Sequence, residues 1–322
     1  PAIEEGLKKE LIAIKDDAKE IEERFYRELE FGTAGLRGIL GAGTNRMNIY
    51  TVSKATQGLA DYINHRPDKK DSTEPDSVAI ACDSRHMSPE FADISASVLN
   101  ANGIRAYVFD SLRPTPELSF AIRYLHCIAG INVTASHNPA EYNGYKVYWE
   151  DGAQVSEPYD KAIMDCVNQV TDMLSPKLMA KEEAIEKGLY ITIGQEVDDA
   201  FMKAVSETVK EKDLIREHGS DVRIVYTPLH GAGIKIVPEL LKRNGFTDVH
   251  VVKEQEVPDG AFPTVAYPNP EVKEALQLAH ELADKVDADL VIGTDPDSDR
   301  MGVMVKDHEG SFCNLTGNLI GC

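Results

Sequence analysis

The sequence lacks any apolar run approaching the ~20 residues that a membrane-spanning helix needs. It also opens without a recognisable signal peptide. Its five cysteines are scattered and form no CxxC pair, which is typical of free thiols in a reducing compartment. From these absences we expect a cytoplasmic protein that has no membrane partner.

Positive charge is scarce. The chain carries 34 Lys and Arg against 54 Asp and Glu, a formal charge of −20 with a pI near 4.8. Such an acidic protein repels phosphate backbones, so we expect no nucleic-acid partner. It also repels small anions, so any anion-binding site must carry its own local cations. At 322 residues, with 42% apolar and 27% charged residues, the composition is that of an ordinary globular protein of about two domains.

Apolar periodicity predicts strands and helices in alternation. An amphipathic helix over 3–29 is expected to serve packing only. The first unit is predicted to contain helices 52–63, 88–100 (with Ser88 as N-cap), 117–126 and 156–170, and strands 78–82, 105–109, 128–136 and 145–149. The second is predicted to contain helices 197–210, 233–241 and 271–286, and strands 222–226, 249–252, 290–292 and 301–305, the last in a hairpin. This order indicates the α/β class, as two successive three-layer α/β/α domains with mixed, largely parallel sheets. We place the first domain at 1–193, the second at 194–306, and the start of a truncated third domain at 307–322.

One loop presents a serine. The apolar run 128–133 ends in Thr134-Ala-Ser136-His137-Asn-Pro139, as expected of a strand that delivers a hydroxyl to an open loop. Pro139 disfavours helical geometry at the residue before it, so the loop does not simply wind into a helix. An ordinary turn is the alternative interpretation, since serine, asparagine and proline all favour turns. A second segment of the sequence favours the interpretation that Ser136 is a functional residue.

That second segment is an acidic loop, in which Asp295, Asp297 and Asp299 alternate after an apolar strand. Like charges ~4 Å apart repel by about 4 kcal/mol per pair at an effective dielectric of 20. A hard divalent cation with oxygen ligands would relieve this repulsion. An EF-hand is excluded, because Arg300 and Lys306 stand where glycine and glutamate are required. A solvated acidic turn and a haloacid-dehalogenase-type phosphatase remain as alternatives, although the latter expects Thr or Val at Asp299.

A glycine-rich segment, Phe31-Gly-Thr-Ala-Gly-Leu-Arg37-Gly38, is followed by two more glycines at 41 and 43. Clustered glycines let backbone amides approach an anion, and Arg37 would add a fixed charge. A glycine-rich hairpin with a surface arginine explains the segment equally well. Arg85 follows strand 78–82 and lies on the sheet rim expected for the serine, while His230 lies in a loop of the second domain that could face the same cleft.

Together the serine loop, the acidic loop and the glycine-rich segment resemble the alpha-phosphohexomutase family, the phosphoglucomutases and phosphomannomutases. The similarity is greatest to the branch with bacterial phosphoglucomutases and phosphopentomutase-like enzymes. The resemblance implies that Ser136 is a phosphorylated nucleophile and also a ligand of one Mg²⁺ ion. It further implies roles for the residues around the serine: Asp295, Asp297 and Asp299 as metal ligands, Arg37 and Arg300 as contacts of the phosphoserine, Lys146 as general acid/base, and His137 in proton transfer. From their places in the loops described above, we expect Arg85 and His230 to take part in substrate binding.

The resemblance also implies a reaction, which is reversible phosphoryl transfer between the 1- and 6-positions of a hexose phosphate. A sugar bisphosphate would be both intermediate and activator, and the partner would be a small sugar phosphate. A phosphopentomutase or glucose 1,6-bisphosphate synthase shares these motifs, and a non-catalytic module on a mutase scaffold is the alternative of another class. A serine hydrolase is disfavoured, because no Gly-x-Ser-x-Gly elbow surrounds the serine.

The family's pattern is unfinished at the end of this sequence. The family normally adds two further domains, whereas here the chain stops at Cys322, just after a Thr316-Gly-Asn318 turn. We therefore expect an N-terminal two-domain fragment that holds the serine and the acidic loop but has little activity alone. The sequence does not predict which sugar phosphate is used or the oligomeric state.

Overall fold

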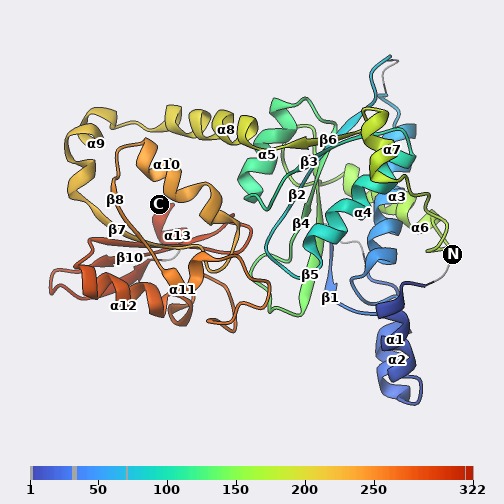
Figure 1. The fold of residues 1–322 in the computed structure, drawn as a ribbon, viewed down its shortest axis with the longest axis horizontal. Helices are drawn as coiled ribbons and strands as arrows, with labels where there is room; N and C mark the ends of the chain where they lie inside the picture. Colours follow the sequence, from blue (N-terminus) through green and yellow to red (C-terminus); the bar gives the residue numbers. More distant parts are fainter. Residues whose placement is uncertain (1–2, 31–34, 70–71, 316, 322) are drawn as a thin grey trace.

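Two mixed sheets dominate the structure, a computed structural model that describes residues 3–30, 35–69, 72–315 and 317–321 (Figure 1). The first sheet has the order β1-β5-β4-β2-β3-β6. Its strands are β1 (Leu36–Ile39), β2 (Ser77–Cys82), β3 (Arg105–Phe109), β4 (Ala129–Val133), β5 (Tyr142–Trp149) and β6 (Tyr190–Ile193). The pairs from β4 through β2 and β3 to β6 are parallel, whereas β5 pairs antiparallel with both β4 and β1.

Helices cover both faces of the first sheet. One face packs against α3 (Ile49–His65), α4 (Ser88–Ala101) and α6 (Tyr159–Gln169), with the short α7 (Lys181–Glu186) beside β6. The other face packs against α5 (Thr115–Tyr124) and the start of α8 (Gln195–Thr208), which runs on toward the second sheet (Figure 1). Apolar strand residues buried on both faces are what a three-layer domain requires.

The second sheet has the order β11-β10-β9-β7-β8. Its strands are β7 (Arg223–Thr227), β8 (Asp248–Val251), β9 (Leu290–Thr294), β10 (Met301–Lys306) and β11 (Phe312–Leu315). Its helices are α9 (Lys212–His218), α10 (Val237–Arg243), α11 (Lys253–Glu256), α12 (Gln277–Val286) and α13 (Gly317–Ile320), with 3-10 turns at Gly219–Asp221, Ala232–Lys235 and Lys273–Leu276. The helix α12 packs on β7 and β9, and α10 contacts β8.

The predicted fold class is confirmed, because both units are α/β with mixed, largely parallel sheets. The predicted hairpin is also present, since β10 pairs antiparallel with β11. This hairpin extends past residue 306, where we placed the start of a third domain; the domain boundaries remain a prediction. Thr316 and Cys322, which carried the expected C-terminal truncation, lie outside the described residues.

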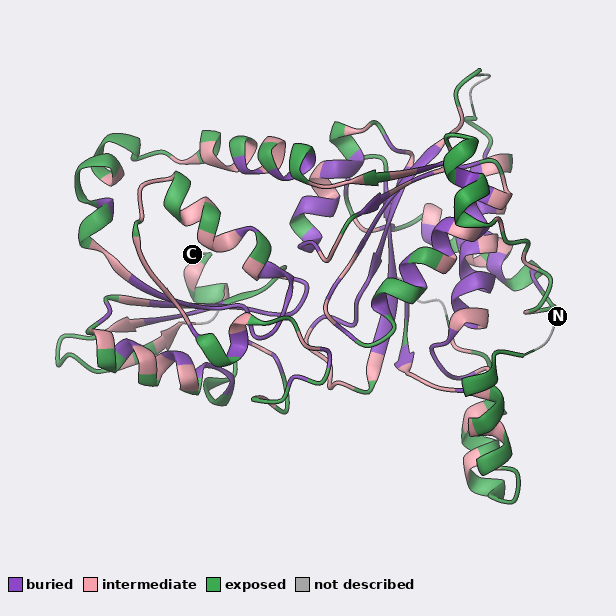
Figure 2. Ribbon diagram, in the orientation of Figure 1, coloured by how far each residue is buried: buried purple, intermediate pink, exposed green. Residues whose placement is uncertain are grey.

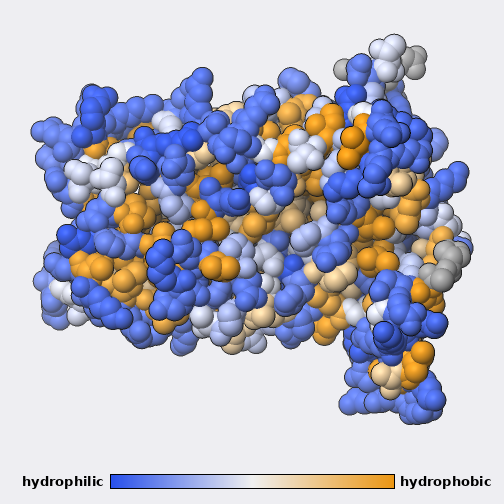
Figure 3. Space-filling model, viewed as in Figure 1, coloured by the Kyte–Doolittle hydropathy of each residue, from blue (hydrophilic) through white to orange (hydrophobic). Residues whose placement is uncertain are grey.

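The single helix predicted over 3–29 is wrong. Two helices stand there, α1 (Glu5–Ala13) and α2 (Ala18–Phe25). The break occurs because the Asp17 carboxylate accepts the backbone N–H groups of Lys19 and Glu20 and so starts a new helix. Neither helix has a buried residue, as Figure 2 shows. Ile12 and Phe25 are therefore exposed, and apolar surface shows over these two helices in Figure 3.

Smaller differences have local causes. Ser88 is not the N-cap of α4, because its hydroxyl donates to Asp83 Oδ1 at 2.9 Å and Met87 precedes the helix instead. The predictions missed α7, β6 and α9; α7 and α9 are short and rich in charged residues, which hides the apolar pattern, whereas β6 is only four residues long. In the part of the chain that the structure describes, no helix combines the length and apolar character needed to cross a bilayer.

Candidate active site

The serine loop begins where β4 ends. Ser136 adopts a positive φ of 54° and is buried. Its backbone N–H donates to the Thr134 hydroxyl at 2.8 Å, and that hydroxyl donates onward to Asp83 Oδ2 at 2.6 Å. A left-handed serine is uncommon and is tolerated only where its surroundings hold it. Here the chain itself supplies those surroundings.

Arg85 is the main clamp on this loop. Its guanidinium donates to the backbone carbonyls of Ser136 at 2.7 Å, Pro139 at 2.8 Å and Tyr142 at 3.0 Å, and also to the carbonyl of Asn138. Its Nε lies 3.3 Å from Asp83 Oδ2, and both side chains are fully buried. The fork of guanidinium donors suits such a set of acceptors. Burial, outweighing the attraction of Asp83, lowers the pKa of Arg85.

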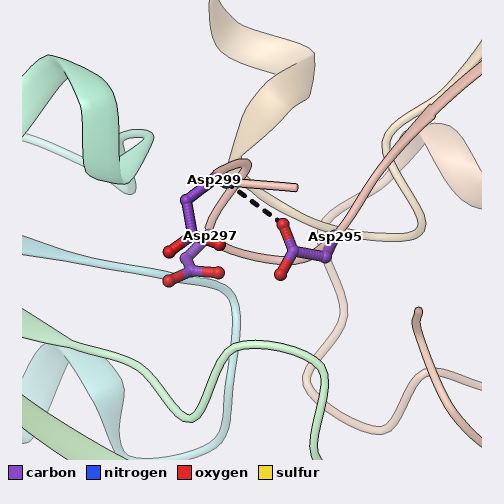
Figure 4. A group of neighbouring side chains, drawn as sticks. All are labelled: Asp295, Asp297 and Asp299. Carbon is purple, nitrogen blue, oxygen red and sulfur yellow. Dashed lines mark hydrogen bonds between the residues drawn. The ribbon is translucent and has the colours of Figure 1, made fainter. Parts of the chain in front are cut away.

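The acidic loop follows β9 in the second sheet. Asp295 Oδ1 accepts the backbone N–H groups of Asp299 at 3.1 Å and Arg300 at 3.0 Å, which curls the loop around that carboxylate (Figure 4). Ser298 has a positive φ of 55° in the same turn. The three carboxyl groups face a common space, with one oxygen of each within 4.8 Å of the others.

The two loops meet. Ser136 Oγ donates to Asp295 Oδ2 at 2.9 Å, although the residues are 159 positions apart. A second link crosses the same boundary, since Lys146 Nζ in β5 donates to Asp297 Oδ2 at 2.8 Å and Asp299 Oδ2 at 3.3 Å. The structure thus brings together the hydroxyl, the three carboxylates and the lysine that the sequence singled out.

The three carboxylates of the acidic loop repel one another and so disfavour one another's charged forms. Burial first, and then the charges of Asp297 and Asp299, raise the pKa of Asp295 well above its usual range. Burial and the charge of Asp297 likewise raise the pKa of Asp299. Burial acts to raise the pKa of Asp297 too, but the Lys146 ammonium, together with hydrogen bonds from Asp295 and Thr115, outweighs burial and lowers it. Neutralising this cluster is favourable, as it would be with a bound cation.

The donor set fits a hard divalent cation. Three converging carboxylates and a serine oxygen are the oxygen ligands that such ions take. Asp297 Oδ1 is buried and has no hydrogen-bond partner among the described residues. A buried carboxylate oxygen without a donor is costly, and coordination of a cation would satisfy it.

Cationic side chains flank the serine. Arg37, exposed on β1, reaches Asn138 Oδ1 of the serine loop at 3.5 Å. Arg300 is also exposed, with its Nε 4.0 Å from Asp299 Oδ1. His137 Nδ1 lies 3.2 Å from Ser136 Oγ. Burial, followed by the charges of Arg300 and Arg37, lowers the pKa of His137, so its imidazole tends to be neutral. The segment Phe31–Ala34 that precedes Arg37 in the glycine-rich motif lies outside the described residues.

Lys146 holds its proton in this arrangement. Burial alone would lower its pKa, but the charges of Asp297 and then Asp299 outweigh burial and raise it. A lysine paired with two carboxylates is a proton donor first, and becomes an acceptor only when that pairing weakens.

Two predicted substrate-binding residues lie elsewhere. Arg85 is fully buried with its donors engaged by the serine loop, so it has no face for substrate. His230 is buried in the second unit, where its ring nitrogens contact the Val257 carbonyl at 3.1 Å and Thr264 Oγ1 at 2.9 Å. Their substrate-binding roles stay predictions, which this arrangement does not support, because the serine loop surrounds Arg85 and the loop through Thr264 covers His230.

Sequence reasoning missed two polar residues at this site, Thr115 and Asn132. Thr115 opens α5, and its hydroxyl donates to Asp297 Oδ2 at 2.9 Å. Asn132 lies fully buried in β4 and donates to that hydroxyl at 2.6 Å. Asn132 was visible in the sequence as the one polar residue in the apolar run 128–133. Thr115, inside a Pro-Thr-Pro turn, carried no such signal.

Family models match most of the chain. Residues 28–173 match the model described as phosphoglucomutase/phosphomannomutase, alpha/beta/alpha domain I, and residues 199–310 match that of domain II. The chain is 40% identical over 307 residues to a phosphoglucomutase of Staphylococcus epidermidis, covering 94% of this chain and 54% of that protein. It is 39% identical over 300 residues to a phosphoglucomutase of Staphylococcus haemolyticus, covering 93% and 53%.

A similar solved structure is that of a Thermus thermophilus protein described as a phosphomannomutase. It has a TM-score of 0.72 and 25% identity, over 89% of this chain and 58% of that one. The chain therefore spans about half the length of the curated relatives it matches. The two family-model matches include the serine loop and the acidic loop.

Proposed function

Because this chain belongs to the phosphoglucomutase/phosphomannomutase family, we propose that it is the part of a phosphosugar mutase that carries the phosphoryl group. The proposed reaction is reversible transfer between the 1- and 6-positions of a hexose phosphate through a phosphorylated Ser136. The observation that carries the proposal is the contact of the Ser136 hydroxyl with the acidic loop, 2.9 Å from Asp295. The name of the 40%-identical relatives favours glucose phosphate as the sugar.

In the proposed mechanism, phosphoserine donates its phosphoryl group to the free hydroxyl of the sugar phosphate. The P–Oγ bond breaks, a bond from phosphorus to the sugar oxygen forms, the proton of the sugar hydroxyl passes to a base, and the released serine Oγ takes up a proton. The resulting sugar bisphosphate reorients and returns its other phosphate to Ser136. In that return step the bond from phosphorus to the sugar oxygen breaks and that oxygen takes back a proton. The Oγ–H bond breaks as the new P–Oγ bond forms, and its proton has an acceptor in reach, His137 Nδ1 at 3.2 Å. The lowered pKa of His137 keeps its imidazole neutral, which suits it to this role.

Phosphoryl transfer requires positively charged groups placed around the phosphoryl group that is transferred. We assign Arg37 and Arg300 to the phosphoserine oxygens, and Lys146 to proton exchange with the sugar hydroxyl from its place beside Asp297. The residues that would hold one Mg²⁺ ion are Asp295, Asp297, Asp299 and the serine oxygen. When bound, the ion neutralises the carboxylates and stabilises charge on the phosphoryl group.

The substrate class is open to a direct comparison. A phosphopentomutase and a glucose 1,6-bisphosphate synthase would use the same serine and the same acidic loop. Assays of the whole protein with glucose 1-phosphate and with ribose 1-phosphate distinguish a phosphohexomutase from a phosphopentomutase. Accumulation of the sugar bisphosphate would identify a glucose 1,6-bisphosphate synthase. The low activity predicted for this chain alone is tested in the same assays. A non-catalytic module would show no turnover in any of them.

Phosphorylation of the serine tests the proposal. The whole protein is incubated with glucose 1,6-bisphosphate and Mg²⁺ and digested, and the peptides of this chain are analysed by mass spectrometry. Phosphate is expected on Ser136, absent from Ser136→Ala and retained in Ser175→Ala, whose hydroxyl bonds only its own turn. If Ser136 stayed unmodified in the folded chain while bisphosphate and Mg²⁺ were both present, the proposed function would be overturned.

A further inference from the structure

We infer that Thr115 and Asn132 are positioning residues, which select the oxygen of Asp297 that is offered to the cation. The inference rests on the proposed function, because it concerns the same metal loop. Thr115 contacts Asp297 twice: its backbone N–H donates to the Asp297 carbonyl at 2.8 Å, and its hydroxyl donates to Oδ2 at 2.9 Å. The first turn of α5, in one unit, thus holds the acidic loop of the other.

The direction of these hydrogen bonds follows from their chemistry. A carboxylate only accepts, so the single hydrogen of the Thr115 hydroxyl points to Asp297. That hydroxyl can then only accept from Asn132, whose amide nitrogen lies 2.6 Å away. Asn132 therefore commits the threonine hydrogen to Asp297. All three residues are buried, so no water competes for these bonds.

The sheet register brings a second donor to the same oxygen. Asn132 in β4 lies directly opposite Lys146 in β5, so both side chains stand on the face toward α5. Lys146 Nζ donates to Asp297 Oδ2 at 2.8 Å, beside the Thr115 hydroxyl. Oδ2 thus receives two donors from this chain, whereas Oδ1 is buried with no partner among the described residues.

This asymmetry sets the orientation of the carboxylate. With Oδ2 held from two sides, the Asp297 group cannot rotate without breaking a buried hydrogen bond. Oδ1 is left as the buried oxygen with no hydrogen-bond partner among the described residues. Residues that orient a metal ligand in this way typically change metal affinity 10–100-fold when they are removed. We expect the lower end of that range, because Lys146 remains.

The test measures Mn²⁺ binding to the metal-free chain by electron paramagnetic resonance, with no turnover involved. Thr115→Val keeps the side-chain shape and loses the donor, and should weaken Mn²⁺ binding about tenfold. Thr115→Ser keeps the hydroxyl and should stay within about twofold of wild type. The double variant Thr115→Val/Asn132→Leu also removes the Asn132 amide, which Thr115→Val alone leaves without its acceptor, so it should recover thermal stability while Mn²⁺ binding stays weak.

The double variant separates positioning from stability. If it recovered Mn²⁺ affinity together with its melting temperature, or if folded Thr115→Val bound Mn²⁺ as tightly as wild type, the inference would be overturned. Should Thr115→Val alone not fold, the double variant carries the test. If the wild-type chain itself bound no Mn²⁺, the proposed metal site would fail instead, so the two failures are distinguishable.

Discussion

The serine loop and the acidic loop differ in how they are held. Both follow the carboxyl end of a sheet strand, and both contain a residue with positive φ. The serine loop has its carbonyls bound by Arg85 and its backbone N–H bound by Thr134. The acidic loop has three carboxylates that raise one another's energy and a buried oxygen with no partner among the described residues. The serine loop is held by contacts within the chain, whereas the acidic loop needs a bound cation to balance its charge.

The largest loss of stability should come from removing the Arg85 side chain that holds the serine loop. Arg85→Met leaves Asp83 buried without its ion-pair partner and several carbonyls without a donor, so it should lower the free energy of unfolding by about 3–5 kcal/mol. Urea unfolding followed by circular dichroism measures this. Arg216→Met, which breaks an exposed pair with Asp213, is the matched control and should have little effect. Equal losses in the two variants would show that the clamp is not needed.

Binding of Mg²⁺ at the acidic loop should stabilise the folded chain. Mg²⁺ at about 100 times its dissociation constant should raise the free energy of unfolding by about 2.7 kcal/mol, and removing the ion with a chelator should reverse this. Asp297→Asn should abolish the gain, while Asp213→Asn, on an exposed helix, should keep it. Calorimetry with and without Mg²⁺ measures both. A gain that survived in Asp297→Asn would place the stabilising ion elsewhere.

Without metal, removing a charge from the acidic loop should stabilise the fold. The pKa of Asp299 is raised by burial and by Asp297, which means that its charged form is unfavourable in the folded state. Asp299→Asn should therefore raise the melting temperature of the metal-free chain, by up to about 1 kcal/mol of unfolding free energy given its partial exposure. The same variant should gain less from Mg²⁺. A lower melting temperature would contradict the repulsion argued here.

A buried carboxyl outside both loops supplies a pH comparison. Burial, and then Asp198, raise the pKa of Glu117 from 4.5 to about 9. The folded state therefore binds this proton more tightly, so the stability it confers is present below about pH 4.5 and is lost as pH rises to about 9. Glu117→Gln should flatten this part of the melting-temperature profile with or without Mg²⁺. An unchanged slope in Glu117→Gln would show that the titrating group lies elsewhere.

Residue spacing was enough to predict the α/β class, the serine loop and the acidic loop. Position after a strand is readable from apolar runs, and the repulsion among Asp295, Asp297 and Asp299 is readable from charge alone. The direction in which a side chain points after a strand cannot be read from the sequence in this way. Arg85 turns inward because the serine loop curls around it, and His230 turns inward because the loop through Thr264 does the same. These contacts depend on loop paths that no periodicity encodes.

Contacts between the two units were the least predictable. Thr115 and Asn132 reach Asp297 only because α5 and β4 lie against the acidic loop in three dimensions. A polar residue in an apolar strand is a usable signal for such a site, but it names no partner. The roles assigned to the site residues remain predictions until they are measured.

The most direct test is an anomalous diffraction map from crystals of this chain soaked in Mn²⁺. We expect one peak among the carboxylates of Asp295, Asp297 and Asp299, within coordination distance of Ser136 Oγ and of Asp297 Oδ1. No peak at the acidic loop, or a peak too far from the serine for a shared ion, would contradict this expectation.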